Sequence, residues 1–443
     1  MRRIHARWIV PITSPPIGNG TLVEEGGRIV SVGARIAPEA GDIDLGDAIL
    51  MPGLVNTHCH LELTAMRGFL DGLGFRDWIL RLTFARRAVL THEMMLDSAH
   101  LGVAEGLLHG ITTFADTGDS GAGFDAMLAA GVRGVCYREV FGPDPAQSAE
   151  AAAGLGSRID DMLPRATSLV SVGVSPHAPY TVSDPLFTAV AEIARARRLP
   201  LAVHIAESEL EQRLVVDGDG AFADGLRRRD IGVTARARSP IALLGRLGVL
   251  ETKPLLIHCV RVDATDIADI AVHDCAVAHC PASNAKFGHG IAPLAQLLAA
   301  GVRVGIGTDS VASNDRMDLL DEARLAALFA NARERTHDGL SAQRALELAT
   351  LGGARALGLG NEIGSLEVGK SADLAAFALP HHRAPLHDPV ASAVFALAGQ
   401  PASLVMVAGR ELVRNGSLAA HDPALSPRVQ AAADALQAWS AAQ

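Results

Sequence analysis

One pattern dominates the long middle of the chain: short apolar runs alternate with longer stretches of helical periodicity that are rich in Ala, Leu and Arg. Buried parallel strands are near-continuous apolar runs, and their alternation with helices indicates βαβ units. Eight such units in residues 53–362 fit a closed barrel, a fold that takes about 250 residues or more. The sequence therefore predicts an α/β protein built on a (β/α)8 TIM-type barrel. Its strands are expected at Leu54–Thr57, Gly110–Phe114, Gly131–Cys136, Val170–Ser175, Leu201–Ile205, Pro254–His258, Cys275–Ala278 and Arg303–Ile306.

The two ends of the chain have a different sequence pattern, in which short apolar runs are separated by tight turns. A glycine-rich turn stands at residues 25–27, another at 364–369, and a further apolar run covers Val405–Val413. Such turns between short apolar runs predict antiparallel strands. We expect residues 1–52 and 363–426 to build one small β-sandwich domain beside the barrel of residues 53–362. The Ala-rich residues 427–443 are expected to form a terminal helix.

Charge and cysteine content restrict the partners and the compartment. The 443 residues carry a formal net charge of −10, which argues against nucleic acid and anionic membranes, because both need clustered positive charge. No stretch approaches the ~20 apolar residues of a membrane span, and the segment before Pro11 is a poor signal peptide. Five scattered cysteines do not suit a secreted disulfide framework. We expect a cytoplasmic protein that acts on a small molecule; whether it forms a homo-oligomer stays open.

Metal-binding side chains stand at the carboxyl ends of four predicted strands, where a barrel places its active site. His58 and His60 lie two positions apart on a strand and therefore point to the same side. Three later strands end in His204, His258 and Asp309. Each residue alone fits a buried polar group or a helix cap, but their recurrence at strand ends predicts a metal centre. Three imidazoles and one carboxylate suit Zn2+ or Fe2+, with one position left open for water.

Several motifs follow one another in order: PGLVNTHCHLELTAMRG, SPHAPYTVS, HIAESE, IHCV, HCPASNAKFGHGIAP and GTDSVASND. Together they resemble the amidohydrolase superfamily, in the branch that holds S-adenosylhomocysteine and methylthioadenosine deaminases, aminodeoxyfutalosine deaminases, guanine deaminases and triazine hydrolases. The resemblance covers nearly the whole chain. It implies one divalent metal ion, Zn2+ before Fe2+, and the catalytic residues Glu207, His258 and Asp309. The implied metal ligands are His58, His60, His204 and Asp309.

The implied reaction is the hydrolytic deamination of an aminated nitrogen heterocycle, with a purine-nucleoside-like compound favoured. A zinc-type ion lowers the pKa of the water it binds from ~15.7 toward ~7. Asp309 is expected to accept a proton from the attacking water, and Glu207 to protonate the ring nitrogen and the departing ammonia. His258 is expected to hydrogen-bond the oxygen that adds to the ring carbon.

Two absences narrow the metal chemistry. Binuclear members of the superfamily often bridge two metals with a carbamylated lysine before the third histidine, but the lysines here are Lys253, Lys286 and Lys370, all beyond His204. A lysine-bridged centre is thereby excluded. The Pro-Cys-x-x-Cys ligand pair of the other zinc-deaminase fold is also missing, since Cys280 precedes Pro281.

Four residues are candidates for contact with the substrate. Trp78 stands where related deaminases have a tryptophan against the nucleoside, although packing of a helix on the barrel explains it equally well. His177 resembles the family histidine near the substrate base. Arg138, with Glu139 beside it, ends the third predicted strand and can contact a polar substituent or form a salt bridge within the barrel.

The fourth candidate, Glu62, follows from a departure. S-adenosylhomocysteine deaminases carry an acidic residue shortly after the tryptophan helix that holds the ribose hydroxyls, whereas here the residues between Asp77 and Glu93 include no carboxylate. Glu62, two positions after His60, is an alternative carboxylate at the pocket mouth; pairing with an arginine such as Arg67 is the competing interpretation. The motif HLEL resembles the corresponding motif of the aminodeoxyfutalosine deaminases and favours a substrate of that type.

Two competing functions remain. The same metal site suits a hydrolase that removes halide, alkylamine or thiomethyl from a triazine or pyrimidine, although Glu207 favours deamination because departing ammonia needs a proton donor. The other is a catalytically silent metal-binding scaffold. The charged segment Glu209–Ser239 is either a lid over the site or a solvated insertion.

Overall fold

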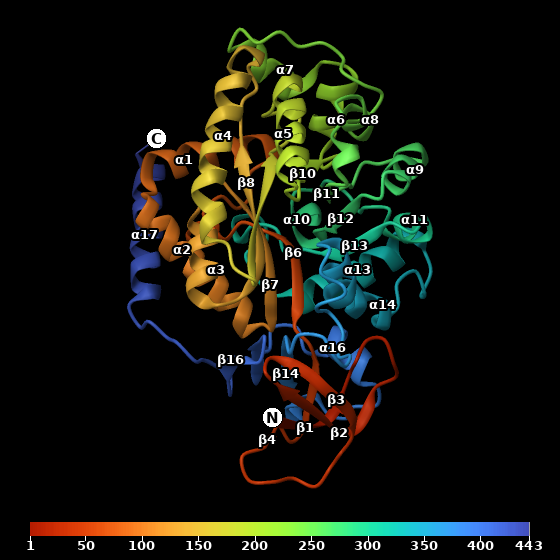
Figure 1. Ribbon diagram of the computed structural model, residues 1–443. Coiled ribbons are helices and arrows are strands. Elements are labelled where there is room, and N and C mark those ends of the chain that lie inside the picture. The colour runs from red at the N-terminus through yellow and green to blue at the C-terminus, as the bar shows by residue number, and fades with distance from the viewer. Residues whose placement is uncertain (443) are drawn as a thin grey trace.

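The computed structural model describes residues 1–442 and contains all eight predicted barrel strands. They form two four-stranded parallel sheets, β6-β7-β8-β9 and β10-β11-β12-β13. Parallel bridges between Val174 and Leu201 and between Cys59 and Asp309 join the sheets at both seams, which closes the barrel (Figure 1). The predicted fold class is confirmed. The strands are β6 Leu54–Cys59, β7 Ile111–Gly118, β8 Arg133–Val140, β9 Val170–Pro176, β10 Ala202–Ile205, β11 Leu255–His258, β12 Ala276–His279 and β13 Arg303–Ile306.

The barrel strands are apolar because helices cover one face and the barrel interior covers the other. Every residue of β7 and β8 is buried. Both strands run four residues beyond the predicted ends at Phe114 and Cys136. The added residues include Asp116, Thr117, Arg138 and Glu139, whose polar side chains end the apolar pattern but not the strand.

The helices surround the barrel and cover its upper end in Figure 1. The helix after β6 is preceded by the short 3-10 helix η1, Leu61–Met66. The α-helices are α1 Phe75–Val89, α2 His92–Leu108, α3 Ala122–Ala130, α4 Ser148–Met162, α5 Asp184–Arg197, α6 Glu209–Val216, α7 Gly220–Arg227, α8 Pro240–Arg246, α9 Ala264–Val272, α10 Pro281–Lys286, α11 Leu294–Ala299, α12 Val311–Asn314, α13 Leu319–Glu334, α14 Ala342–Glu347, α15 Gly353–Ala356, α16 Pro389–Ala396 and α17 Leu425–Ala441.

Within the described residues, strands from both chain ends form one nine-stranded sheet in the order β17-β16-β15-β14-β5-β1-β2-β3, with β4 paired to β1. The ends meet where β14 pairs antiparallel with β5, placing Leu374 opposite Pro52. We propose the domain boundaries given by the sequence, residues 1–52 with 363–426 against 53–362. The strands are β1 Arg2–Ile9, β2 Ile17–Glu25, β3 Arg28–Ala34, β4 Ile43–Asp44, β5 Ala48–Pro52, β14 Leu374–Ala378, β15 Leu404–Val407, β16 Arg410–Arg414 and β17 Ser417–Leu418.

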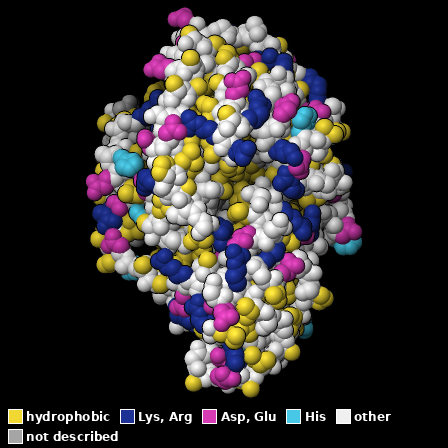
Figure 2. Space-filling view, viewed as in Figure 1, with side chains coloured by type: hydrophobic (Ala, Val, Ile, Leu, Met, Phe, Trp, Pro, Cys, Tyr) yellow, Lys and Arg dark blue, Asp and Glu magenta, His cyan; other side chains and the backbone are white. Residues whose placement is uncertain are grey.

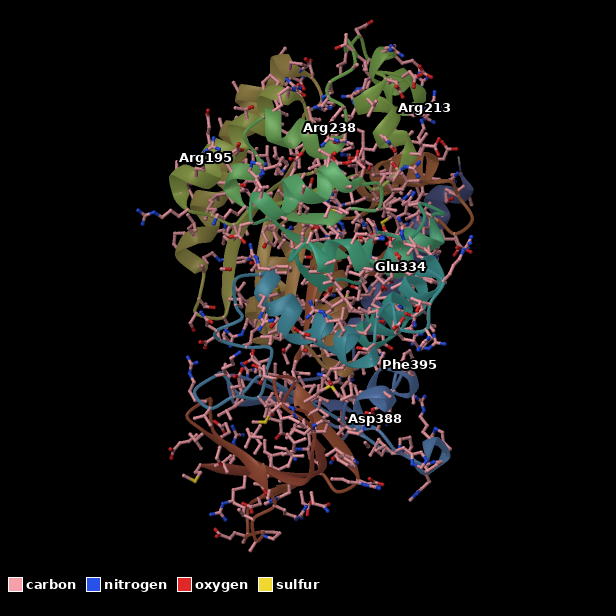
Figure 3. The ribbon with its side chains drawn as sticks, turned by 90° about the vertical axis from the view of Figure 1, so that its right-hand side faces the viewer. Arg195, Arg213, Arg238, Glu334, Asp388 and Phe395 are labelled. Atoms are coloured by element: carbon pink, nitrogen blue, oxygen red, sulfur yellow. The ribbon has the colours of Figure 1, made fainter. Side chains whose placement is uncertain are left out.

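Two helices belong to the C-terminal part of the chain. The sequence interpretation of residues 363–426 as β-structure omitted α16, which is capped by Asp388 and packs on α13 and α14 (Figure 3). The terminal helix α17 packs against α1 and α2. No helix within residues 1–442 is long and apolar enough to cross a membrane. Acidic and basic side chains are interspersed over the face shown in Figure 2.

A buried ion pair links the barrel to the composite sheet. Nε of Arg133 on β8 donates to Oδ2 of Asp373 at 2.7 Å, and Nη2 donates to Oδ1 at 3.1 Å. The Ser371 hydroxyl and the backbone N–H of Ala408 also donate to Oδ1. Both charged side chains are at most 5% exposed, so each depends on the other for its compensation.

Candidate metal centre and substrate cavity

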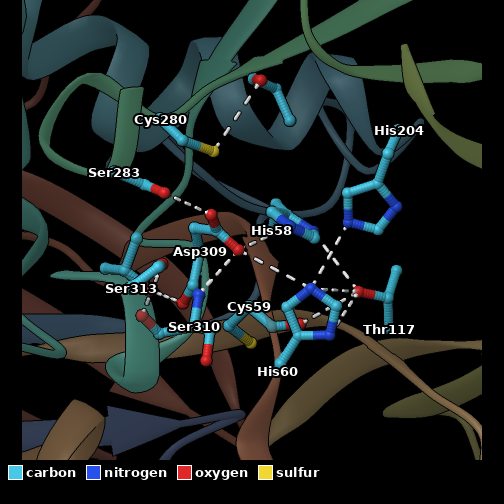
Figure 4. A network of polar contacts seen from close by, with 12 residues as sticks. His58, Cys59, His60, Thr117, His204, Cys280, Ser283, Asp309, Ser310 and Ser313 are labelled. Atoms are coloured by element: carbon cyan, nitrogen blue, oxygen red, sulfur yellow. Dashed lines mark hydrogen bonds and ion pairs between the residues drawn. The ribbon is translucent and has the colours of Figure 1, made fainter. Parts of the chain in front are cut away.

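The predicted metal ligands converge at the carboxyl end of the barrel (Figure 4). His58 Nε2 lies 3.1 Å and His60 Nε2 3.6 Å from Oδ1 of Asp309. His204 Nε2 lies 3.3 Å from His60 Nε2. The structure thus brings together four side chains from β6 and the residue after it, from β10, and from the segment that follows β13, as the sequence predicts.

These side chains have the chemistry of metal ligands. Burial lowers the pKa of His60 to about 3 and holds the pKa of His58 and His204 below their ordinary value, so these imidazoles are neutral, the form that binds a metal ion. Burial alone would raise the pKa of Asp309, but the His58 hydrogen bond and the surrounding imidazoles outweigh it and hold that pKa well below its usual range. Three neutral imidazoles and a carboxylate fit one Zn2+ or Fe2+ ion.

The backbone at these strand ends is strained. Four non-glycine residues have positive φ: Ala206 at 52°, His258 at 78°, Cys259 at 47° and Asp309 at 58°. Such conformations cost on the order of 1–3 kcal/mol each and persist where the surrounding structure enforces them. Ala206 follows β10 directly, His258 ends β11 with Cys259 after it, and Asp309 stands three residues after β13, so the strained positions lie at the carboxyl ends of the strands that carry the site.

Hydrogen bonds fix the orientation of the ligands. His204 Nδ1 lies 3.2 Å from the carbonyl oxygen of His177; because a carbonyl only accepts, Nδ1 carries the proton and Nε2 remains free for a metal. The Ser283 hydroxyl donates to Oδ2 of Asp309 at 2.6 Å (Figure 4). The Thr117 hydroxyl lies 3.3 Å from His60 Nδ1.

Glu207, the predicted proton shuttle, lies close to two histidines. Its Oε1 lies 3.6 Å from His258 Nε2 and 3.5 Å from His289 Nε2. Burial raises the pKa of Glu207, but the two imidazoles outweigh this and bring it below the ordinary value. The Glu211 carboxylate accepts from the backbone N–H groups of Ala206 and Glu207 at 2.8 and 2.9 Å, which anchors this turn.

Three of the predicted metal ligands, His60, His204 and Asp309, line a cavity of about 460 Å³, within the range of small-molecule sites. Aromatic side chains make much of its wall. Tyr180 and Phe222 stack with ring centroids 4.4 Å apart, and the Trp78 and Phe287 rings lie 4.7 Å apart. Such a wall suits a flat heterocycle, which gains stacking contacts as well as burial.

Three of the four predicted substrate-binding residues line the cavity. Trp78, His177 and Glu62 line it. Arg138 is absent from the described lining residues, whereas its neighbour Glu139 is present, because adjacent residues on a strand point to opposite sides.

Glu62 is already paired within the protein. Its Oε1 lies 2.8 Å from Nη2 of Arg86, and its Oε2 accepts from the hydroxyl and the N–H of Ser120. The partner is therefore Arg86 on α1 rather than Arg67, which pairs with Glu105 instead.

The segment Glu209–Ser239 contributes to the cavity. It contains α6 and α7, and Phe222, Leu226 and Arg229 from α7 and its end are among the lining residues. The segment thus forms part of the cavity wall, which a purely solvated insertion would not.

Sequence reasoning assigned no role to several residues of the site. Ser283, Asn284 and His289 all lie in the motif HCPASNAKFGHGIAP, so the motif signalled the segment but not which side chains point inward. Arg86 and Asp119 gave no such signal, because neither lies in one of these motifs. An arginine on a helix, such as Arg86, ordinarily faces solvent.

Comparison with known proteins gives consistent matches over most of the chain. The amidohydrolase family matches residues 49–412. A 5-methylthioadenosine/S-adenosylhomocysteine deaminase from Moorella thermoacetica is 35% identical over 419 residues, which cover 93% of each chain.

Two solved structures extend these matches. A zinc-bound adenosine deaminase from Xanthomonas campestris superimposes with a TM-score of 0.87 at 30% identity, covering 99% of this chain and 98% of the other. A zinc complex of atrazine chlorohydrolase from Arthrobacter aurescens gives a TM-score of 0.84 at 26% identity, covering 98% and 100%. With its barrel, its composite sheet and its ordered motifs, the chain belongs to the amidohydrolase family.

Proposed function

We propose that the protein is a zinc-dependent hydrolytic deaminase of a purine-nucleoside-like compound. The observation that carries the proposal is the position of Glu207, which lies 3.6 Å from His258, while a ring nitrogen of His258 lies within 4.8 Å of His58 and Asp309. The relatives named as methylthioadenosine/S-adenosylhomocysteine deaminase and adenosine deaminase support the same substrate class. We place the protein in the cytoplasm.

His58, His60, His204 and Asp309 would hold the ion, which supplies an acidified water and charge stabilisation when bound. Glu207 is poised as a carboxylate, so it can accept a proton before delivering one to the ring nitrogen. His258 donates from Nδ1 to the amide oxygen of Asn284 at 3.0 Å, which leaves Nε2 facing Glu207 and the reacting centre. Trp78 and His177 position the heterocycle.

The proton count explains why two carboxylates are needed. Hydrolytic deamination replaces the amino group by the oxygen of water and releases ammonia. Water loses two protons in all: Glu207 passes one to the ring nitrogen, and the one that Asp309 accepts is passed on to the departing nitrogen through Glu207, so both carboxylates end unprotonated. General acid–base help of this kind contributes about 10²–10⁴-fold to the rate.

Ammonia release across a panel of compounds tests the proposal. Adenosine, 5′-methylthioadenosine, S-adenosylhomocysteine and guanine are offered to the zinc-loaded protein. We expect ammonia from at least one adenosine derivative, at a rate well above that from guanine. Ammonia from guanine alone, or from none of the four, would refute the substrate class.

A triazine hydrolase is the second candidate, favoured by the likeness to atrazine chlorohydrolase at a TM-score of 0.84. The two differ in their leaving group. Chloride release from atrazine without ammonia release from any adenosine derivative would favour this candidate over the deaminase.

A further inference from the structure

Glu139 is a buried carboxyl group in the cavity wall without a hydrogen-bond partner of its own. It lies at the end of β8, lines the cavity, and its side chain is 6% exposed. No group within the described residues forms a hydrogen bond with its Oε1. Buried polar atoms are almost always satisfied, and an unsatisfied one costs about 1–3 kcal/mol.

The neighbouring charges are already committed to other groups. Glu62, Asp119 and Glu139 come from the segments that follow or end β6, β7 and β8, and all three line the cavity. The guanidinium of Arg86 forms ion pairs with Glu62 and Asp119. Ser120 donates to Glu62 as well. This leaves Glu139 as the carboxyl group of this wall that is open to a ligand.

Glu139 is also not needed to orient a metal ligand. Its Oε1 lies 3.8 Å from His204 Nδ1, which is beyond hydrogen-bond distance. That nitrogen instead donates to the carbonyl oxygen of His177 at 3.2 Å. The tautomer of His204 is therefore set without Glu139.

We infer that Glu139 binds a hydroxyl group on the sugar of the substrate, and so selects nucleosides over free bases; this rests on the proposed function. Glu139 lies on the side of His177 and His204, while Glu207 lies on the side of His258 and His289. In an aminopurine nucleoside the sugar and the amino group are attached to different rings. When the amino-bearing carbon faces Glu207, the sugar is directed away from it, toward the open carboxyl.

Kinetics with paired substrates test the inference. We compare kcat/KM for adenosine and adenine in wild type, in Glu139→Met, which removes the carboxyl at similar length, and in Glu139→Gln, which retains an acceptor oxygen. Glu150→Met, an exposed position on α4, serves as the control. Glu139→Met should lower the value for adenosine about 10- to 100-fold and that for adenine little. Glu139→Gln should lose less than Glu139→Met.

A thermodynamic cycle identifies the hydroxyl. 2′-Deoxyadenosine and 3′-deoxyadenosine are assayed with the same proteins. Removing the hydroxyl that Glu139 binds should lower kcat/KM of wild type by the same factor as the Glu139→Met substitution does. The same removal should not lower kcat/KM of Glu139→Met any further. Because the substitution removes an unpaired buried oxygen, the Tm of Glu139→Met should not fall.

Three results would overturn the inference. Equal losses on adenosine and adenine would show that Glu139 acts on the base or on the reaction. A fall in zinc content would make it a metal ligand with His177 and His204, whose ligand atoms lie within 4.8 Å of it. Coupling of a hydroxyl to Glu62→Met but not to Glu139→Met would assign the sugar to Glu62.

A binding arm separates this inference from the proposed deamination. Purine riboside and purine, which lack the amino group, are titrated calorimetrically into the zinc-loaded wild type and Glu139→Met. Tighter binding of the riboside that is lost in Glu139→Met supports the inference even if wild type releases no ammonia from any compound. Equal riboside affinity in both proteins, or none in wild type, overturns it.

Discussion

The Ser283 hydroxyl donates a hydrogen bond to Oδ2 of Asp309 across 2.6 Å, and neither residue is more than 7% exposed. Ser283 lies on α10, which follows β12, so the bond ties one barrel loop to the ligand at the end of the next strand. The other oxygen, Oδ1, faces His58 and accepts from the N–H of Ser310 at 2.7 Å. Ser283 thereby determines which carboxylate oxygen is directed at the metal centre.

Ser283→Ala should therefore weaken the metal site without unfolding the protein. Loss of an outer hydrogen bond to a ligand typically lowers metal affinity about 10–100-fold. Competition with a chelator of known zinc affinity measures the change, and Ser171→Ala, at an exposed position of β9, is the control. Unchanged zinc affinity in Ser283→Ala would show that the Asp309 carboxylate is oriented by the backbone alone.

His204→Ala tests the ligand set itself. We expect one zinc per wild-type chain, and a fall in affinity of at least about 10–100-fold in the variant, because one of four protein ligands is removed. Elemental analysis after dialysis measures the content, with His337→Ala at an exposed position as control. Two zinc ions per wild-type chain, or full occupancy in His204→Ala, would contradict a mononuclear site.

Glu207→Gln separates proton transfer from metal binding. The amide keeps the size of the side chain but cannot accept and return a proton, so kcat should fall by about 10²-fold or more at unchanged zinc content. Glu209→Gln, two residues on and 70% exposed, should behave as wild type. Near-normal turnover by zinc-loaded Glu207→Gln would remove Glu207 from the reaction.

The barrel could be predicted because its signal is local. Each strand is an apolar run that helices on one face and the barrel interior on the other must bury, so Val203 or Leu256 can be assigned without knowing its neighbours. The ends of β7 and β8 could not be predicted in this way, because Asp116 and Glu139 continue the strands with polar side chains. The helix α16 was missed because its eight residues stand among strands and turns.

The clustering of the predicted metal ligands could be anticipated for a related reason. His58 and His60 share one side of a strand, and barrel topology brings His204 and Asp309 to the same end. The pairing of Glu62 with Arg86 is different in kind, since it depends on where α1 crosses the cavity mouth. Likewise, which of Arg138 and Glu139 faces inward depends on the register of β8, and a shift by one residue reverses the answer.

Asp116 should make the stability of the protein depend on pH. It is 2% exposed, and burial raises its pKa to about 7, despite the hydrogen bond that it accepts from the N–H of Leu61 at 2.8 Å. The unfolded chain releases this proton near pH 3.8, whereas the folded protein holds it until about pH 7. The stability that protonated Asp116 contributes is therefore present below about pH 4 and is lost as the pH rises through 7.

Asp116→Asn should remove this dependence, since the amide oxygen can still accept from Leu61. Urea unfolding of the variant and of wild type at pH 4.5 and 8.5 measures this dependence. We expect the variant to gain on wild type at pH 8.5 by a few kcal/mol, on the order of the pKa difference, and little at pH 4.5. An equal difference at both pH values would place the effect in packing.

The ion pair between Arg133 and Asp373 should couple the barrel to the composite sheet. Arg133→Met leaves the Asp373 carboxylate buried with only Ser371 and the Ala408 N–H as donors, and breaking a buried pair in this way costs about 3–5 kcal/mol. Asp373→Asn keeps an acceptor oxygen but leaves the guanidinium uncompensated, so it should also destabilise the protein.

The double variant lacks both charges, so no buried charge is left without a partner. The free energy of unfolding, measured in urea for all four proteins, should therefore show the double variant less destabilised than the sum of the single ones. Strict additivity would mean that each residue acts through its other contacts and not through the ion pair.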